Sequence, residues 1–198
     1  MKMMTGYLEP TSGSIEVDQL HIDMDTRAIQ ARIGYLPANC PVWPEMPVID
    51  YLKYQAHMHG VEDVRIQPAM VDAVRRTSLK EKATSSIQTL SRGYRQRVGV
   101  AQAILHSPDI IILDEPTNGL DPTQILQMRE LIRELAKTAT VILSTHILQE
   151  VQAVCERVLI MRDGKLVVDS LIADLQSGRQ LRLAIDSGEA SDYLACVA

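Results

Sequence analysis

The sequence predicts an α/β fold in which a mostly parallel sheet is flanked by helices and carries a small helical insert. Four large apolar residues, Ile110–Leu113, are followed directly by Asp114 and Glu115. This pattern is typical of a buried parallel strand whose C-terminal end opens into a polar site. A second apolar run lies at 140–145, and residues 48–90 show the three-to-four spacing of amphipathic helices. An ordinary core strand with a solvated acidic turn is the alternative for the first run.

Composition limits the classes of protein. The 198 residues suffice for one domain, or for one domain with a short appendage. A net charge of −5 without any basic run argues against a nucleic-acid partner. No apolar stretch approaches the roughly 18 residues of a membrane span, and no secretory signal begins the chain. The three cysteines form no C-x-x-C pair, which predicts a cytoplasmic protein without zinc: Cys40, Cys155 and Cys196.

The N-terminal segments are predicted from the spacing of apolar residues and from the positions of glycine and proline. Residues 1–9 have helix-like apolar spacing up to Gly6, so we expect the last turn of a helix there. Residues 14–21 alternate apolar and polar side chains, as a half-buried strand does. Ile33–Leu36 is predicted to be a strand that enters a stiff loop with four prolines, Pro37, Pro41, Pro44 and Pro47.

The predicted helical insert begins near Val48 and ends near Leu90. Trp43, Tyr51 and Tyr54 cluster at its start, and two interpretations stay open. The rings pack the insert onto the core, or they form a surface on which a partner docks. Two histidines, His57 and His59, are two positions apart and face different directions on a helix, so we expect surface residues and no metal site.

The next helix is predicted to begin after Leu90 and to run to about His106. Ser91 is a good N-cap for it. Gly93 would let a ligand approach the backbone at the end where free N–H groups and the helix dipole favour phosphate. An ordinary cap explains the same two residues, but their position directly before the Asp114 strand favours the phosphate site.

After the central strand, Asn118-Gly119 supplies the chemistry of a turn. Asp121 followed by proline predicts an N-cap and a helix to about Lys137. The strand at 140–145 comes next, and His146 follows its end. If the two buried strands are parallel neighbours, His146 lies at the same sheet edge as the two carboxylates.

The C-terminal part is predicted to hold four short elements. A helix is expected at 147–155, and a hairpin at 157–168 is expected to turn at Asp163-Gly164. A short helix at 171–175 should then lead to a strand through three alternating apolar residues, Leu181, Leu183 and Ile185.

With these motifs in order, residues 1 to about 170 resemble an ATP-binding cassette (ABC) transporter ATPase subunit. Leu90-Ser91-Arg92-Gly93-Tyr94 resembles the signature loop of that family, and Ile110–Asp114 resembles its Walker B strand. Gly119-Leu120-Asp121 is similar to its D-loop, and His146 to its switch histidine. The order and spacing of four motifs make the resemblance specific. It implies a P-loop NTPase-like fold.

The resemblance also implies catalytic roles, with ATP and Mg²⁺ as cofactors. Asp114 would hold Mg²⁺ through water. Glu115 would polarise the water that attacks the γ-phosphate, and His146 would contact that phosphate. These roles agree with the chemistry of phosphoryl transfer, which needs positioning and charge neutralisation.

Two partners are implied in the same way, a second ABC ATPase subunit and a transmembrane permease. Ser91 and Gly93 would clamp the γ-phosphate of ATP on the opposite subunit of a homo- or heterodimer, and Asp121 would cross the dimer interface. ATP-driven dimerisation would energise transport. The permease would bind near Trp43 to Tyr54 and hold the cytoplasmic protein at the cell membrane.

The sequence also departs from the family pattern. It contains no G-x-x-x-x-G-K-S/T loop and no upstream aromatic residue for adenine, and Ala38 takes the place of a polar residue. We therefore expect an ATPase domain at 1–170 that lacks its N-terminal strands and P-loop, with the insert at about 45–92. Residues 171–198 would begin a truncated C-terminal extension. Two hypotheses follow, a hydrolysing subunit and a non-hydrolysing fragment that only offers its signature loop to another cassette.

Overall fold

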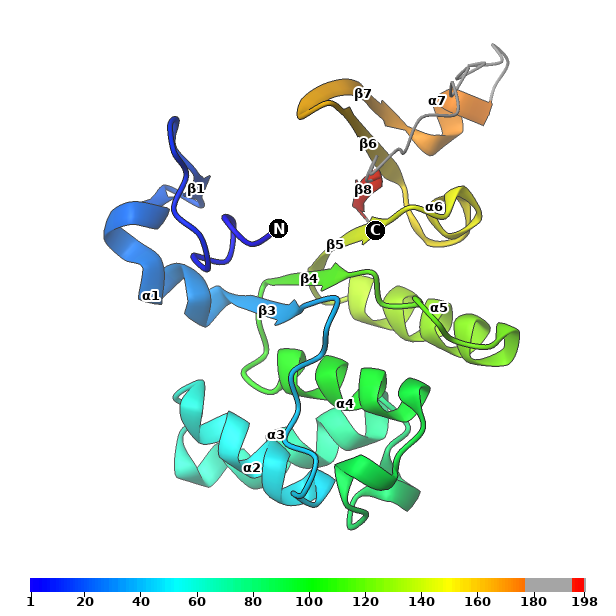
Figure 1. The fold of residues 1–198 in the computed structure, drawn as a ribbon. Coiled ribbons are helices and arrows are strands. Elements are labelled where there is room, and N and C mark those ends of the chain that lie inside the picture. The colour runs from blue at the N-terminus through cyan, green and yellow to red at the C-terminus, as the bar shows by residue number, and fades with distance from the viewer. Residues whose placement is uncertain (177–193, 198) are drawn as a thin grey trace.

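The computed structural model describes residues 1–176 and 194–197, and a six-stranded sheet forms the centre of this part of the chain (Figure 1). The strand order is β3-β4-β5-β8-β6-β7. The strands are β3 (Ile33–Leu36), β4 (Ile110–Asp114), β5 (Thr140–Thr145), β6 (Arg157–Arg162), β7 (Lys165–Leu171) and β8 (Leu194–Val197). β3, β4 and β5 run parallel, whereas β8 pairs antiparallel with β5 and β6, and β7 antiparallel with β6.

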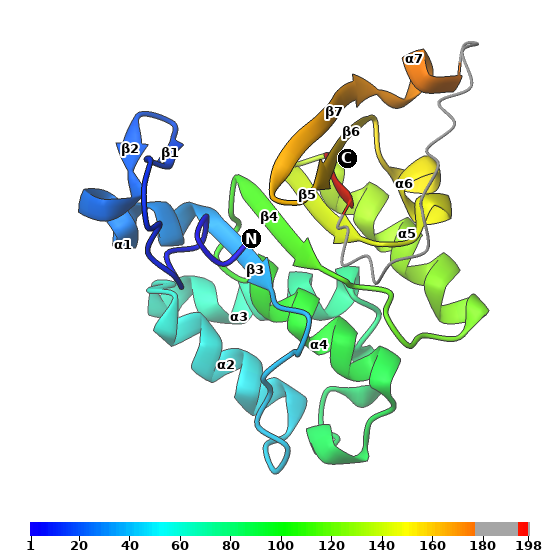
Figure 2. The ribbon, with the colours of Figure 1, turned by 45° about the horizontal axis from the view of Figure 1, so that its top comes forward.

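Helices flank the parallel strands. α2, α3 and α4 lie together on one side of β3 and β4, with α5 beside them (Figures 1 and 2). α1 leads into β3. The helices are α1 (Ile22–Arg32), α2 (Val48–Met58), α3 (Asp63–Arg76), α4 (Arg92–Ile104), α5 (Pro122–Ala136), α6 (Leu148–Val154) and α7 (Ile172–Gln176), with single 3₁₀ turns at Lys80–Lys82 and Ile87–Thr89. None of the helices in residues 1–176 has the length and hydrophobicity of a membrane span.

Strand alternation divides the apolar side chains between two cores, because successive residues of a strand face opposite sides of the sheet. The larger core joins one face of β3–β5 to α2, α3, α4 and α5. Its strand residues include Leu36, Ile111, Leu113, Val141 and Leu143. The smaller core lies on the other face and contains Ile33 and Ile112 with Ile22 and Ile29 of α1. Asp114 continues the alternation of the second face at the end of β4.

Most elements predicted from the sequence are present. β3, β4, β5 and the β6–β7 hairpin occur where expected, and the hairpin turns at Asp163 and Gly164, both with positive φ. α2 and α3 lie within the predicted helical insert. α4 and α5 begin after the predicted caps, Ser91 and Asp121. The predicted strand through Leu181 falls outside the described residues.

The N-terminal predictions are wrong in three respects. Residues 1–9 form hydrogen-bonded turns and no helix, with Gly6 at a φ of 70°. The segment 14–21 is no single strand but a hairpin of β1 (Glu16–Val17) and β2 (Leu20–His21), because Asp18 and Gln19 adopt left-handed conformations. α1 was not predicted, since it buries only Ile22 and Ile29 and so lacks an apolar stripe.

One histidine is also placed differently. His57 is exposed on α2 as expected. His59 is half-buried and stacks on His106, with ring centres 4.3 Å apart and planes at 6°. The two rings therefore join the end of α2 to the end of α4.

Candidate functional site

The strands β4 and β5 lie side by side in the sheet (Figure 2). Their carboxyl ends bring the predicted catalytic residues together. The two strands are parallel neighbours, and Asp114 pairs with Ser144 in their register. The Ser144 hydroxyl donates a hydrogen bond to Asp114 Oδ1. The Glu115 backbone N–H donates to the Ser144 carbonyl oxygen at 3.1 Å. The ends of both strands are therefore fixed to each other.

His146 lies at the same edge, as the sequence predicts. Its Nδ1 is 2.9 Å from Glu115 Oε1. The imidazole must donate in this hydrogen bond, because an ionised carboxylate only accepts. The Glu115 side chain is 8% exposed and that of His146 is 59% exposed. A buried carboxylate is thus linked to solvent by the histidine ring.

Glu115 is unusual in two further ways. Its Oε2 is buried and accepts no hydrogen bond from the described residues. Its φ of 50° lies in the left-handed region, which is uncommon for a residue with a side chain. Buried polar atoms are nearly always paired, and backbone strain concentrates at functional sites. The free oxygen is therefore suited to accept a hydrogen bond from a water or a substrate.

The residues present fit Mg²⁺ better than a metal held only by protein. Within residues 1–176 and 194–197 there is no group of three or more His, Cys, Asp and Glu side chains that could hold a metal. Mg²⁺ typically takes one or two carboxylates and leaves its other positions to water and phosphate. Asp114, half-buried at the end of β4 with one oxygen bound to Ser144, suits this arrangement.

The N-termini of α4 and α5 bring a second group of predicted residues together. Ser91 is exposed and its hydroxyl accepts from the Tyr94 N–H at 3.4 Å. Asp121 accepts from the Gln124 N–H at 2.9 Å. Gly93 is buried, and a Cβ there would lie 2.2 Å from Gln124 Oε1. In this structure the missing side chain of Gly93 makes room for Gln124, and the approach of a ligand to the Gly93 backbone stays a prediction.

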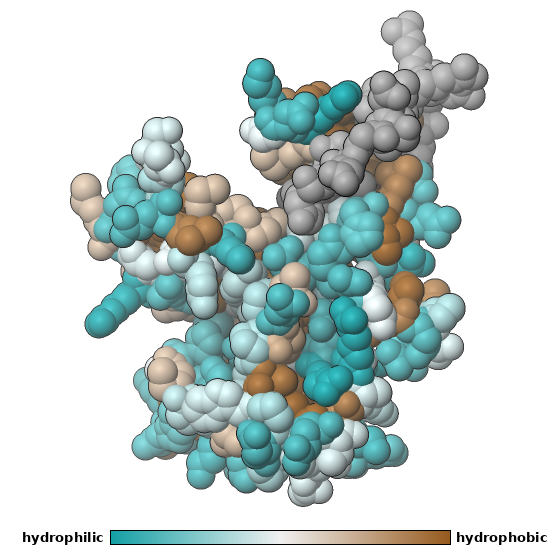
Figure 3. All heavy atoms as spheres, viewed as in Figure 1, coloured by the Kyte–Doolittle hydropathy of each residue, from teal (hydrophilic) through white to brown (hydrophobic). Residues whose placement is uncertain are grey.

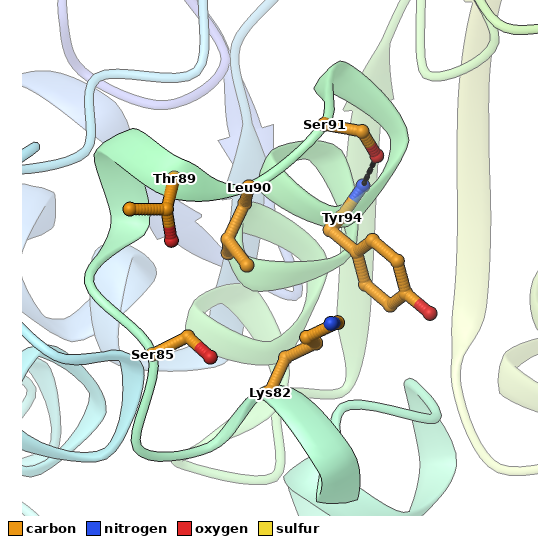
Figure 4. A pocket seen from close by; sticks show the side chains of 6 residues that line it. All are labelled: Lys82, Ser85, Thr89, Leu90, Ser91 and Tyr94. Atoms are coloured by element: carbon orange, nitrogen blue, oxygen red, sulfur yellow. Dashed lines mark hydrogen bonds between the residues drawn. The ribbon is translucent and has the colours of Figure 1, made fainter.

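A small pocket lies beside Ser91 (Figure 4). Its volume is about 230 Å³, and it is lined by Lys82, Ser85, Thr89, Leu90, Ser91 and Tyr94. The Lys82 Nζ lies 5.7 Å from the centre of the Tyr94 ring. One ammonium and several hydroxyls give the pocket the chemistry of a weak anion site. No motif in the sequence pointed to Lys82.

Sequence reasoning also missed Ser144, Thr145 and Glu150. The sequence held one usable signal for Ser144, its place at the end of a buried strand opposite Asp114. Thr145 and Glu150 are buried polar residues on either side of His146. Their contact depends on the turn between β5 and α6, which no pattern of side chains specifies.

The structure is that of the α/β class of proteins, which bind ligands at the carboxyl ends of parallel strands, where Asp114 and Glu115 lie. The family model described as ABC transporter matches residues 1–118. The chain belongs to the ABC transporter family, among its ATP-binding subunits, and the predicted P-loop NTPase-like α/β fold is confirmed.

Curated relatives are similar over most of the chain. The uncharacterized ABC transporter ATP-binding protein YdbJ of Bacillus subtilis is 36% identical over 169 residues, 84% of this chain and 54% of its own length. The ATP-binding protein NatA of the same organism is 31% identical, over 88% of this chain and 72% of its own. The bacitracin transport ATP-binding protein BcrA of Bacillus licheniformis is 34% identical, over 84% of this chain and 54% of its own length. The chain thus spans little more than half the length of two of these relatives.

Two solved structures share the fold. An ATP-binding subunit of an ABC transporter superposes with a TM-score of 0.76 at 26% identity, over 88% of this chain and 73% of that one. The protein cbiO1 from Clostridium perfringens, described as part of the ABC transporter complex cbiONQ, gives 0.77 at 25% identity, over 88% and 72%.

Proposed function

We propose that this protein hydrolyses ATP as a subunit of an ABC transporter, and that ATP-driven association of two such subunits energises transport. The observation that carries the proposal is the state of Glu115. One of its oxygens is bound by His146, and the other is buried without a hydrogen-bond partner among the residues that the structure describes. A carboxylate held in this way, next to Asp114, is suited to orient a water for attack on a phosphate.

Each residue at the ends of β4 and β5 would have its own role in ATP hydrolysis. The Nδ1–H of His146 holds Oε1 of Glu115, so that Oε2 is left to accept a hydrogen from the attacking water. The rest of the exposed His146 ring is available to the phosphate. Asp114 would hold Mg²⁺, which supplies charge neutralisation when it is bound with ATP. Ser144 keeps Asp114 in register with β5.

The second half of the site would act on a nucleotide held by the opposite subunit, in a homo- or heterodimer. Ser91 is exposed at the N-terminus of α4, where the helix dipole favours phosphate. Asp121, exposed at the N-terminus of α5, would cross the dimer interface. Gly93 would contribute its backbone N–H from beneath Gln124. Lys82 adds a positive charge in the adjoining pocket.

The aromatic cluster supports a permease partner. Tyr51 is fully buried, so it packs the insert onto the core. Trp43 and Tyr54 are 48% and 37% exposed, with ring centres 4.7 Å apart. Hydrophobic atoms gather over the segment that descends from β3 to α2 (Figure 3). We propose that this surface docks a transmembrane permease, which would place the protein at the cytoplasmic side of the cell membrane.

The experiment is ATP hydrolysis by the Glu115→Gln variant under single-turnover conditions. We expect the rate to fall about 10²-fold or more, because the amide cannot take up a proton from the water. The control is Glu130→Gln, which makes the same change on an exposed face of α5 and should leave the rate unchanged. Unchanged hydrolysis in Glu115→Gln removes Glu115 from this role.

A second candidate is a non-hydrolysing chain that offers Ser91 and Gly93 to another cassette. The observation that favours it is the absence of G-x-x-x-x-G-K-S/T from these 198 residues, because such a loop makes most contacts to a bound triphosphate. Equilibrium binding of a Mg-ATP analogue to the 198 residues distinguishes the candidates. Micromolar affinity excludes the second. We also propose that the ATPase domain ends near residue 170.

A further inference from the structure

Two buried polar side chains bracket His146. Thr145 is 0% exposed and Glu150 is 1% exposed. The Thr145 hydroxyl donates to Glu150 Oε2 at 3.0 Å and accepts from the Ile147 N–H at 3.1 Å. One hydroxyl therefore holds both the residue that follows His146 and the first turn of α6.

The backbone closes the same turn. The Glu150 N–H donates to the Ile147 carbonyl oxygen at 3.0 Å. Thr145 lies at the last position of β5, and Glu150 lies on α6. The residues on either side of His146 are thus fixed in the core, while its ring reaches out to Glu115.

Stability alone gives no reason for a carboxyl group at position 150. The Oε1 atom of Glu150 is buried and has no hydrogen-bond partner within the described residues. Burying a carboxylate with one hydroxyl as its partner is costly, and an apolar side chain of similar length often serves stability equally well.

We propose that Thr145 and Glu150 are positioning residues that set His146 against Glu115. The Thr145 hydroxyl fixes the backbone turn, and Glu150 fixes the orientation of that hydroxyl. The consequence for hydrolysis rests on the proposed function, whereas the geometry of His146 can be measured without any nucleotide.

The experiment compares Thr145→Val, Thr145→Ser and Glu150→Met in the full chain by NMR of histidine side-chain nitrogens. The chain has five histidines, and His146→Gln assigns the signal of interest. In the unaltered protein, Nδ1 of His146 should show the shift of a donor to a carboxylate. We expect Thr145→Ser to keep that shift, because the hydroxyl remains. Thr145→Val and Glu150→Met should move it toward that of a free imidazole.

Thermal unfolding separates positioning from folding. Glu150→Met should keep or raise the melting temperature while it releases His146, a combination that a purely structural role does not produce. If Thr145→Val fails to fold, Glu150→Met still decides the matter. A His146 signal unchanged in a folded Glu150→Met protein overturns the proposal.

Activity provides a separate measurement. In a protein that hydrolyses ATP, Glu150→Met should lower kcat about 10-fold with little change in KM, because a misplaced group affects the chemical step. If Glu115→Gln has no effect on hydrolysis but Glu150→Met moves the His146 signal, the proposed function fails and the positioning role stands. If Glu115→Gln abolishes hydrolysis but Glu150→Met leaves the His146 signal unchanged, the proposed function stands and the positioning role fails.

Discussion

Asp114 and Glu115 are adjacent in the sequence but have different conformations. Asp114 continues β4 and pairs with Ser144. Glu115 has a φ of 50°, a left-handed conformation that costs roughly 1–2 kcal/mol for a residue with a Cβ. The hydrogen bond from its N–H to Ser144 holds it there. The sequence could predict where the two carboxylates lie, because an apolar run marks the strand. It could not predict the strained backbone, since glutamate carries no signal for it.

Gly34 offers a stability test at the level of one residue. A Cβ at this position of β3 would lie 2.1 Å from the Ala103 carbonyl oxygen of α4. Backbone cannot move aside as a side chain can, so we expect Gly34→Ala to lower the free energy of unfolding by about 2–3 kcal/mol. Urea denaturation measures the change.

Gly60→Ala is the matched control for Gly34→Ala. Gly60 has a φ of 72° and no atom within 4 Å of a Cβ placed there. Gly60→Ala should lower the free energy of unfolding by only about 1 kcal/mol, because alanine is less stable than glycine at a positive φ. A loss in Gly34→Ala no greater than that in Gly60→Ala would mean that the close approach of β3 and α4 is relaxed in solution.

Elements with a strong local pattern could be predicted, and those held by distant contacts could not. β4 and β5 are apolar runs, and α5 begins with Asp121 and proline, which are local signals. α1 shows no such signal because the core contacts it through only two side chains. β8 lies between β5 and β6, a pairing over a long stretch of chain that no local pattern reports. The burial of Gly93 under Gln124 likewise depends on a contact between distant residues and could not be predicted from a local pattern.

The stacked pair of His59 and His106 predicts a pH dependence at the junction of α2 and α4. Burial lowers the pKa of both rings, that of His106 from 6.5 to about 4 with a smaller contribution from His59. Between these values the unfolded chain takes up a proton that the folded ring does not. Stability is therefore complete above about pH 6.5 and falls as the pH drops toward 4, by about 1–2 kcal/mol after allowance for partial exposure.

Urea denaturation of the wild type and of His106→Gln at pH 7.5 and pH 5 measures this effect. Glutamine can still donate to the Ile33 carbonyl oxygen that His106 contacts at 3.2 Å, so the fold should persist with a weaker pH dependence. Equal pH dependence in His106→Gln and wild type would exclude His106 as the titrating group.

At the scale of the whole molecule, the chain carries two separate halves of a proposed hydrolysis site. One half lies at the ends of β4 and β5, and the other at the N-termini of α4 and α5. In the proposed function the first would accept a hydrogen bond from water through Glu115, whereas the second would offer a hydroxyl and helix N–H groups to phosphate. In a dimer of two copies related by a twofold axis, the first half of each subunit would face the second half of the other, which makes two complete sites. The sequence predicted both halves from their motifs, and only the assembled dimer can test their pairing.

The most direct test mixes two inactive variants. Ser91→Arg blocks one half of the site and Glu115→Gln disables the other, so each variant alone should hydrolyse almost no ATP. If the site is shared between subunits, an equimolar mixture forms heterodimers with one intact site, and about a quarter of the wild-type rate returns. A mixture as inactive as its components would contradict a shared site.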